Sequence, residues 1–177
     1  PLSSDYGSSP VKFARGNPVM VYTDLIRSHG VRLHHASYLL RQLHSGDESR
    51  LQDFFYSHSP ETIHLRYGYR SAVMSPERAH RLVDVAEDRG LALGIFSGQN
   101  DEEVLQAVGR YCIETKFQAE VAFVVRESKR RCGMATALIR ELASCAAARG
   151  IQVVRAQVLR ENYAMRGMFM RYHPTLT

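Results

Sequence analysis

The chain has few cysteines, no long apolar stretch and no leader-like start. Its three cysteines, Cys112, Cys132 and Cys145, form no Cys-x-x-Cys pair, and an odd number cannot close into a full set of disulfides. We therefore expect a reducing, cytoplasmic setting. No apolar run approaches the roughly 20 residues that a membrane-spanning helix needs. The first ten residues, PLSSDYGSSP, lack the basic start and apolar core of a signal peptide. The sequence thus predicts neither a disulfide framework nor insertion in a membrane.

The chain also lacks aromatic residues in its most basic segment. The formal net charge is +5, which suits either nucleic acid or a polyphosphate ligand. Sites for single-stranded nucleic acid interleave aromatic side chains with their basic ones. The most basic segment, residues 126–131, contains no aromatic residue. We therefore expect a phosphate-bearing small molecule rather than nucleic acid. The eight histidines show no metal-ligand spacing, so no metal site is expected.

The length of 177 residues fits one domain. Residues 1–17 are rich in Ser, Gly and Pro, and we expect them to form a flexible tail. Residues 18–177 are then the folded domain, with an N-terminal extension over residues 18–37.

The periodicity of apolar residues predicts a mixed α/β fold with a β-α-β unit near its end. Strands are expected at Met20–Ile26, Val31–Leu43, Leu91–Phe96, Val104–Ile113, Ala119–Val125 and Ile151–Leu159. Helices are expected after Ser45, after Ser59, after Ser75 as far as Arg89, and at Gly133–Arg149 and Glu161–Tyr172.

The segment VVRESKRRCGMATALIREL carries the clearest chemical signal. A strand ends at Val125, a loop follows with Arg126, Lys129, Arg130 and Arg131, and a helix begins near Gly133. A glycine lets a ligand approach the backbone closely, because it has no Cβ. The free N–H groups of the first helical turn attract an anion. The segment therefore indicates a site for a phosphate or pyrophosphate, although a solvated basic loop before an ordinary helix has the same charge.

The spacing Arg130-x-x-Gly133-x-Ala135 resembles the R/Q-x-x-G-x-G/A signature of the GNAT superfamily of N-acetyltransferases. The resemblance implies a central, mostly antiparallel sheet flanked by helices, and acetyl-CoA as co-substrate. It implies that the phosphates meet Arg130, Arg131, Cys132, Gly133, Met134, Ala135 and Thr136. Cys132 could also be a thiol activated by the surrounding charge, but a filler position in the loop is the preferred interpretation.

Two further segments fit the same resemblance. The strand ending in Phe123, Val124 and Val125 is similar to the family's fourth strand, whose backbone pairs with the pantetheine arm. The segment RGIQVVRAQVLRENYAMRGMF resembles the fifth strand and the following helix, and places Asn162 beside the cofactor. Asn162 is equally well suited to cap that helix, and both roles are compatible.

Softer similarity in SGDESRLQDFFYSHSPETIHLRYGY, MSPERAHRLVDV and LALGIF is typical of bacterial Pat-like protein lysine acetyltransferases. The resemblance implies that Glu120, on the fourth strand, is the general base, acting directly or through water. Glu114 and Glu127 are the next candidates, and a solvated or arginine-paired Glu120 is the plain alternative. The implied acceptor is a protein lysine, such as one on an acyl-CoA synthetase, while the sequence leaves another protein, a polyamine and an antibiotic amine open.

The sequence departs from the family in two places. Phe169 stands where many relatives have a tyrosine that protonates the thiolate, which leaves the general acid unassigned. The chain also ends at Thr177, before the last strands of a typical GNAT domain. We expect either a truncated sheet with an exposed edge or one completed by a partner chain, as in a homodimer. These departures leave a catalytically silent acyl-CoA-binding regulatory module as the alternative function.

Overall fold

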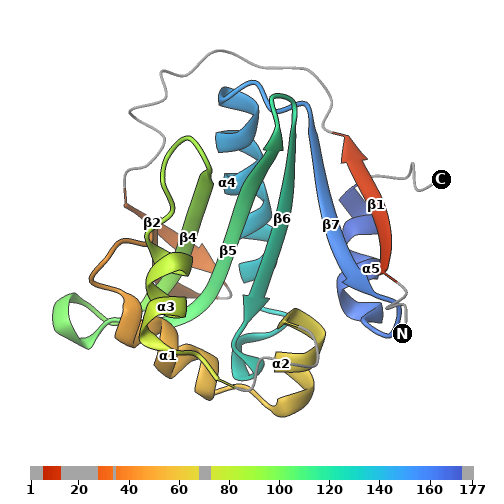
Figure 1. Ribbon diagram of the computed structural model, residues 1–177. Helices are drawn as coiled ribbons and strands as arrows, with labels where there is room; N and C mark the ends of the chain where they lie inside the picture. Colours follow the sequence, from red (N-terminus) through yellow and green to blue (C-terminus); the bar gives the residue numbers. More distant parts are fainter. Residues whose placement is uncertain (1–5, 13–27, 34, 68–72, 173–177) are drawn as a thin grey trace.

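A single mixed sheet organises the chain (Figure 1). The computed structural model of the 177-residue chain describes residues 6–12, 28–33, 35–67 and 73–172. The sheet has the strand order β1-β7-β6-β5-β4-β3-β2, and every neighbouring pair is antiparallel except β6 and β7. Its strands are β1 Tyr6–Lys12, β2 His29–Leu33, β3 Ala36–Gln42, β4 Gly90–Ser97, β5 Val104–Thr115, β6 Gln118–Val125 and β7 Val153–Leu159. The expected central, mostly antiparallel sheet is confirmed.

In the described part of the chain, five helices cover the two faces of this sheet. They are α1 Glu48–Tyr56, α2 Pro60–Tyr67, α3 Pro76–Val83, α4 Met134–Ala148 and α5 Tyr163–Tyr172. Short 3-10 turns lie at Asn100–Glu102 and Glu127–Lys129. Helices α1, α2 and α3 lie in front of the sheet in Figure 1, and α4 and α5 lie behind it. Helix α2 lies against β6, and α4 packs on β4, β5 and β6.

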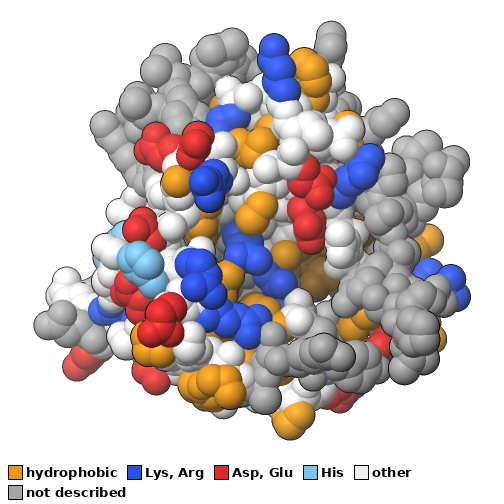
Figure 2. All heavy atoms as spheres, viewed as in Figure 1, with side chains coloured by type: hydrophobic (Ala, Val, Ile, Leu, Met, Phe, Trp, Pro, Cys, Tyr) orange, Lys and Arg blue, Asp and Glu red, His pale blue; other side chains and the backbone are white. Residues whose placement is uncertain are grey.

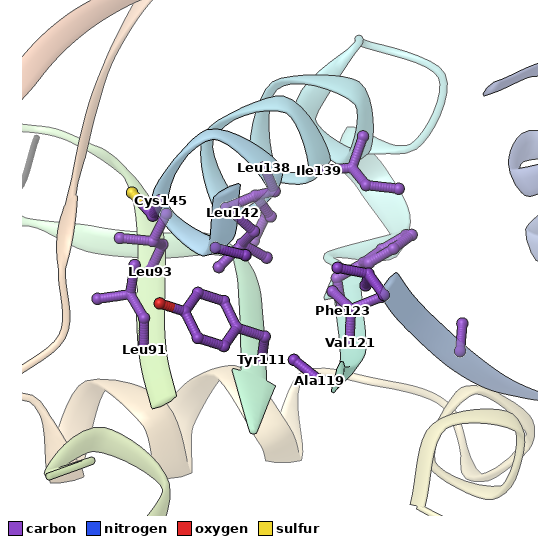
Figure 3. Packing of buried hydrophobic residues seen from close by; sticks show 14 of the residues in the cluster. Leu91, Leu93, Tyr111, Ala119, Val121, Phe123, Leu138, Ile139, Leu142 and Cys145 are labelled. Atoms are coloured by element: carbon purple, nitrogen blue, oxygen red, sulfur yellow. The ribbon is translucent and has the colours of Figure 1, made fainter. Parts of the chain in front are cut away.

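Each face of the sheet has its own apolar core, because side chains alternate along a strand. Behind the sheet, Leu91, Tyr111, Val121 and Phe123 pack against α4 (Figure 3). In front of it, α1 and α3 bury a second cluster that includes Val124. Successive residues of β6 therefore belong to different cores, and this alternation fixes which β6 side chains face which helices.

Strand β1 is the main departure from the sequence prediction. Residues 1–17 are expected to be a flexible tail, but Tyr6–Lys12 pairs antiparallel with β7, Tyr6 opposite Leu159 and Lys12 opposite Val153. The stretch YGSSPVK lacks an apolar alternation, so the sequence gives no strand signal there. Pro10 is tolerated because β1 is an edge strand that needs no N–H donor on its outer side. The edge of β7 that was expected to be exposed is therefore covered by β1.

Smaller differences concern single turns. The expected strand Val31–Leu43 is in fact a hairpin, because the chain reverses between β2 and β3 at His35, whose φ is 65°. Helix α3 begins after Ser75 as predicted, and the Ser75 hydroxyl accepts the Arg78 N–H at 3.2 Å. It ends at Val83 rather than at Arg89. The strand expected at Met20–Ile26 lies outside the described residues.

The loop between β6 and α4 is fastened to the start of α2. The Glu127 carboxylate accepts hydrogen bonds from the Ser59 N–H at 2.9 Å, the Ser59 hydroxyl at 2.6 Å and the Thr62 hydroxyl at 2.6 Å. The Arg130 guanidinium donates to the same Thr62 oxygen and lies 3.8 Å from Glu127. The hydrogen bonds from Ser59 and Thr62 lower the pKa of Glu127 to about 2. Glu127, the second candidate for the base, is thus engaged in holding the loop.

Gly109 of β5 sets how closely α4 can approach the sheet. A Cβ at this position would lie 2.9 Å from Leu142 Cδ1 and 3.4 Å from Leu138 Cβ. We expect Gly109→Val to lower the free energy of unfolding by about 1–3 kcal/mol through overpacking, measured by urea denaturation. Gly30→Val on β2 is the control, because nothing lies within 4 Å of its Cβ. Equal stability of both variants would contradict this packing.

The lowered pKa of Glu127 predicts a pH-dependent stability. A carboxyl with a depressed pKa stabilises the folded state above its unfolded pKa near 4.5, and this contribution is lost as the pH falls toward 2. We expect wild type to exceed Glu127→Gln in stability at pH 7, by less than about 1 kcal/mol because the carboxylate is half exposed. The difference should shrink between pH 4.5 and pH 2 in urea melts. A difference independent of pH would show that the charge of Glu127 does not contribute.

Candidate functional site

The sheet opens between β6 and β7. Their parallel pairing joins Gln118 to Val153 and ends where Glu120 lies opposite Arg155. On its other side β6 stays paired with β5, and the Arg126 N–H still donates to the Gln106 carbonyl at 2.8 Å. Alternation in an antiparallel ladder then turns the backbone groups of Phe123 and Val125 away from β5, toward the opening. Within the described residues no strand pairs with them there.

A cavity of about 880 Å³ lies at this opening, bounded by the loop after β6, the start of α4, and helices α2 and α5. A small extension of about 30 Å³ continues between β6 and β7, against Val121 and Phe123 on one side and Ala156 and Val158 on the other. The two cavities adjoin, because Leu65, Arg66, Phe123, Asn162 and Met165 line both, and we call them together the channel.

The N-terminus of α4 points its free amides at this channel. Gly133 precedes the helix with φ 81°, in the left-handed region that favours glycine. A Cβ there would meet only Leu33 Cδ2, at 3.6 Å, so the conformation rather than crowding requires the glycine. Ala137 is the first residue whose N–H bonds to a carbonyl of this turn, that of Gly133. The amides of Met134, Ala135 and Thr136 are therefore available to an anion.

Three of the four loop cations line the cavity, namely Lys129, Arg130 and Arg131. The fourth, Arg126, is engaged elsewhere. Its guanidinium donates to the Leu105 carbonyl at 3.1 and 3.3 Å and lies 5.7 Å from the centre of the Phe54 ring. The charge that the sequence concentrates in the loop is thus split between a structural cation and three cations at the cavity.

The predicted cofactor residues mostly gather around the cavity. Phe123, Val124, Val125, Arg130, Arg131, Gly133, Met134, Ala135, Thr136 and Asn162 all line it. The side-chain Oδ1 of Asn162 also accepts the Met165 N–H at 3.2 Å, so this residue caps α5 as well. Cys132 does not line the cavity, and its thiol points to the Arg130 carbonyl at 3.6 Å. This placement agrees with a filler role in the loop.

Glu120, the predicted base, lies at the end of the channel and not in its wall. It is half-buried and is the last β6 residue that pairs with β7. Its side chain is on the front of the sheet, since Ala119 and Val121 belong to the core behind it. Glu114, the other candidate, is exposed near the far end of β5.

Helix α2 contributes residues that the sequence analysis did not identify. Thr62, Leu65 and Arg66 line the cavity, and Leu65 and Arg66 also line its small extension. Their spacing of three and four residues along a helix could have indicated a common face. Nothing in the sequence shows which element this face meets, because α2 reaches β6 only through the tertiary fold.

The channel is closed on its α5 side by aromatic packing. Phe169 is buried, its ring centre 5.6 Å from that of Phe123. It lines the extension but has no proton to donate.

Among the described residues, no helix is long and apolar enough to cross a membrane, and no three acidic, histidine or cysteine side chains are grouped to hold a metal ion.

Comparison with known proteins identifies a family and several solved structures that this chain resembles. The model of the acetyltransferase (GNAT) domain matches residues 38–173. The GNAT domain of S. lividans PAT superposes with a TM-score of 0.74 at 25% identity, over 82% of this chain and 86% of that one. A cAMP-binding acyltransferase from Mycobacterium smegmatis gives a TM-score of 0.58 at 24% identity, over 84% of this chain but only 44% of that one.

A GNAT-family acetyltransferase from Streptococcus pneumoniae shares the fold at 16% identity, with a TM-score of 0.62 over 76% of this chain and 82% of that one. No curated protein matches the chain in sequence. The family match covers most of the chain and includes the basic loop, the start of α4 and the opening between β6 and β7. The chain therefore belongs to the GNAT acetyltransferase family.

Proposed function

We propose that this protein transfers an acetyl group from acetyl-CoA to a primary amine, with a protein lysine side chain as the acceptor. The observation that carries the proposal is a pair of adjoining cavities, with cations and free helix amides at one end and the unpaired backbone of β6 along the wall. The PAT domain from S. lividans supports a Pat-like assignment, and a lysine on an acyl-CoA synthetase is the proposed target class. A cytoplasmic location belongs to the same proposal.

The residues present fit a CoA thioester. Lys129, Arg130 and Arg131, with the free amides at the start of α4, would hold its phosphates. The outward backbone groups of Phe123 and Val125 would hydrogen-bond the amides of its pantetheine arm, like an added strand. The cofactor supplies the activated acyl group. The Cβ-free backbone at Gly133 leaves room for close approach of the phosphates.

Amine acetylation requires that a proton leave the acceptor nitrogen. In the reaction a C–N bond forms at the thioester carbonyl, the C–S bond breaks, and the sulfur leaves as a thiolate that takes up a proton. A lysine amine is mostly protonated at neutral pH, so a base near the channel is needed. Glu120 lies at the end of the channel but outside its lining, and we propose that it takes the proton through a water molecule. An outward N–H of β6 would polarise the carbonyl.

The side chain at position 169 cannot donate a proton to the leaving thiolate. Phe169 is buried against Phe123, which favours departure of the thiolate without an acid from α5. The same observation also fits a second function, that of a regulatory module that binds acyl-CoA without turnover. The two functions differ in one measurement, the release of free CoA thiol in the presence of lysine peptides.

Gly133→Glu tests the phosphate site. The substitution adds negative charge and forces a side chain into the left-handed region. We expect the affinity for acetyl-CoA, measured by calorimetry, to fall at least about tenfold. Gly150→Glu is the matched control, because Gly150 has φ 78°, open space around it and lies at the opposite end of α4. Equal affinity in both variants would sink the assignment of the cavity to the phosphates.

Glu120→Gln tests the base. We expect kcat for lysine-peptide acetylation to fall by about 10²–10⁴ at neutral pH, because general-base assistance is lost. The affinity for acetyl-CoA should stay unchanged. Glu114→Gln, at an exposed position on β5, should keep wild-type kcat. An unchanged kcat in Glu120→Gln would remove this residue from the mechanism.

A further inference from the structure

A group of three arginines surrounds Glu120 on the front of the sheet. Glu120 lies opposite Arg155 of β7, and Arg110 of β5 lies opposite Ala122, two residues further along β6. Residues two apart on a strand share a face, so Arg110, Glu120 and Arg155 point to the same side. Arg66 reaches this group from α2, where the charges of Arg110 and Glu120 both act on it. We call these four residues the arginine cluster.

In the described part of the chain, the guanidiniums of the arginine cluster have no hydrogen-bonding or ionic partner, although that of Arg66 lies over the Tyr67 ring, 4.8 Å from its centre. None of the three makes a hydrogen bond or an ion pair within 4.0 Å there, with Glu120 or with any other described group. The Nε atoms of Arg66 and Arg155 have no access to solvent and no hydrogen-bond partner. Burial lowers the pKa of Arg66 below its usual value of 12.5. These side chains are half-buried. A guanidinium N–H that is shielded from water and has no acceptor is costly, and a bound anion relieves that cost.

The position of Arg66 separates this cluster from the phosphate loop. Thr62, one helical turn earlier on α2, contacts Glu127 and Arg130 of the loop. The charge of Glu120 acts on Arg66, and Glu120 itself is five strand residues, or roughly 16 Å, along β6 from Val125. It lines both the cavity and its extension between the strands. The cluster is thus at the end of the channel where the amine would meet the thioester, and not at the phosphates.

We propose that the arginine cluster binds a carboxylate that the acceptor carries beside its reactive amine. This inference rests on the proposed function, and it specifies the acceptor as an acidic one. An ammonium group that approaches Glu120 alone meets one negative charge and three positive charges, which repel it. A carboxylate next to the amine pairs with the guanidinium forks and leaves the amine free to face Glu120. Figure 2 shows the Lys and Arg side chains gathered over β5 and β6 on this face.

The carboxylate has two sources, an Asp or Glu side chain next to a protein lysine, or the acceptor's own carboxylate in a free amino acid. The first arm compares two peptides with a central lysine, flanked either by glutamates or by the neutral isostere glutamine. The second arm compares L-lysine with lysinamide. A third arm compares malonyl-CoA with acetyl-CoA and reports whether the acyl donor, rather than the acceptor, supplies the carboxylate.

The variants are Arg66→Gln, Arg66→Lys, Arg110→Gln and Arg155→Gln, with Arg78→Gln as the matched control. Arg78 lies over the same Tyr67 ring as Arg66, at 5.5 Å against 4.8 Å, but outside the cavity lining. It is bonded to the Val73 carbonyl. Because Arg78→Gln removes the same net charge, a general attraction of the basic protein for acidic peptides falls equally in both variants.

We expect wild type and Arg78→Gln to use the acidic acceptor at least about tenfold better in kcat/KM than its neutral isostere. The preference should fall to about twofold in Arg66→Gln and take an intermediate value in Arg66→Lys, which keeps the charge without the fork. Circular dichroism and acetyl-CoA affinity verify that the variants fold. If Arg66→Gln does not fold, the affinity of CoA-saturated wild type for N-acetylated acidic and neutral peptides decides instead.

The inference is overturned if wild type shows no preference in either acceptor arm, or if the preference survives in Arg66→Gln as in Arg78→Gln. A preference only for malonyl-CoA overturns the acceptor as the source of the carboxylate. Failure of the proposed function has a different signature, namely no acetyl-CoA binding and no transfer to any amine. In that case, equal binding of acidic and neutral peptides by calorimetry would also end the carboxylate proposal.

Discussion

The point at which β6 and β7 stop pairing determines the rest of the site. The two strands run parallel only as far as Glu120 and Arg155, and beyond them the backbone of β6 faces the channel. Because the other edge of β6 remains fully paired with β5, the strand keeps its shape without support from β7. The core on both faces of the sheet holds it in place, with Val121 and Phe123 behind and Val124 in front. A rigid strand with free backbone groups can then hydrogen-bond an extended ligand at little entropic cost.

Charge is distributed along this strand in two separate groups. At its C-terminal end the loop cations and the free amides of α4 face the cavity, while Glu127 fixes the loop to α2. At the other end three arginines surround one carboxylate. Helix α2 connects both groups, through Thr62 at one end and Arg66 at the other. A displacement of α2 would therefore alter the proposed phosphate site and the proposed acceptor site together.

The sequence predicts the site best where function depends on backbone conformation. Gly133 and the cations before it follow a short local pattern, and the structure places both at the cavity. The sequence predicts the site poorly where side chains from distant parts of the chain come together in the fold. Arg66 and Arg110 are separated by more than 40 residues, and no local pattern in the sequence indicates that they meet. Arg126 is of a residue type that commonly binds phosphates, yet its guanidinium donates hydrogen bonds to the Leu105 carbonyl, 21 residues earlier in the chain. The elements themselves are mostly recovered, but β1, which pairs with β7, has no apolar pattern that would indicate a strand.

Strand β1 gives the fold an unusual order of assembly. Tyr6 pairs with Leu159, so one of the first segments of the described chain depends on the last strand for its hydrogen bonds. During synthesis β2 to β6 can pair with neighbours that are already present, but β1 has no strand to join until β7 has been made. Closing so long a loop is entropically slow, and it comes after the more local pairings. Until then the outer edge of β7 is open to pairing with other chains, which exposes this late step to misassembly.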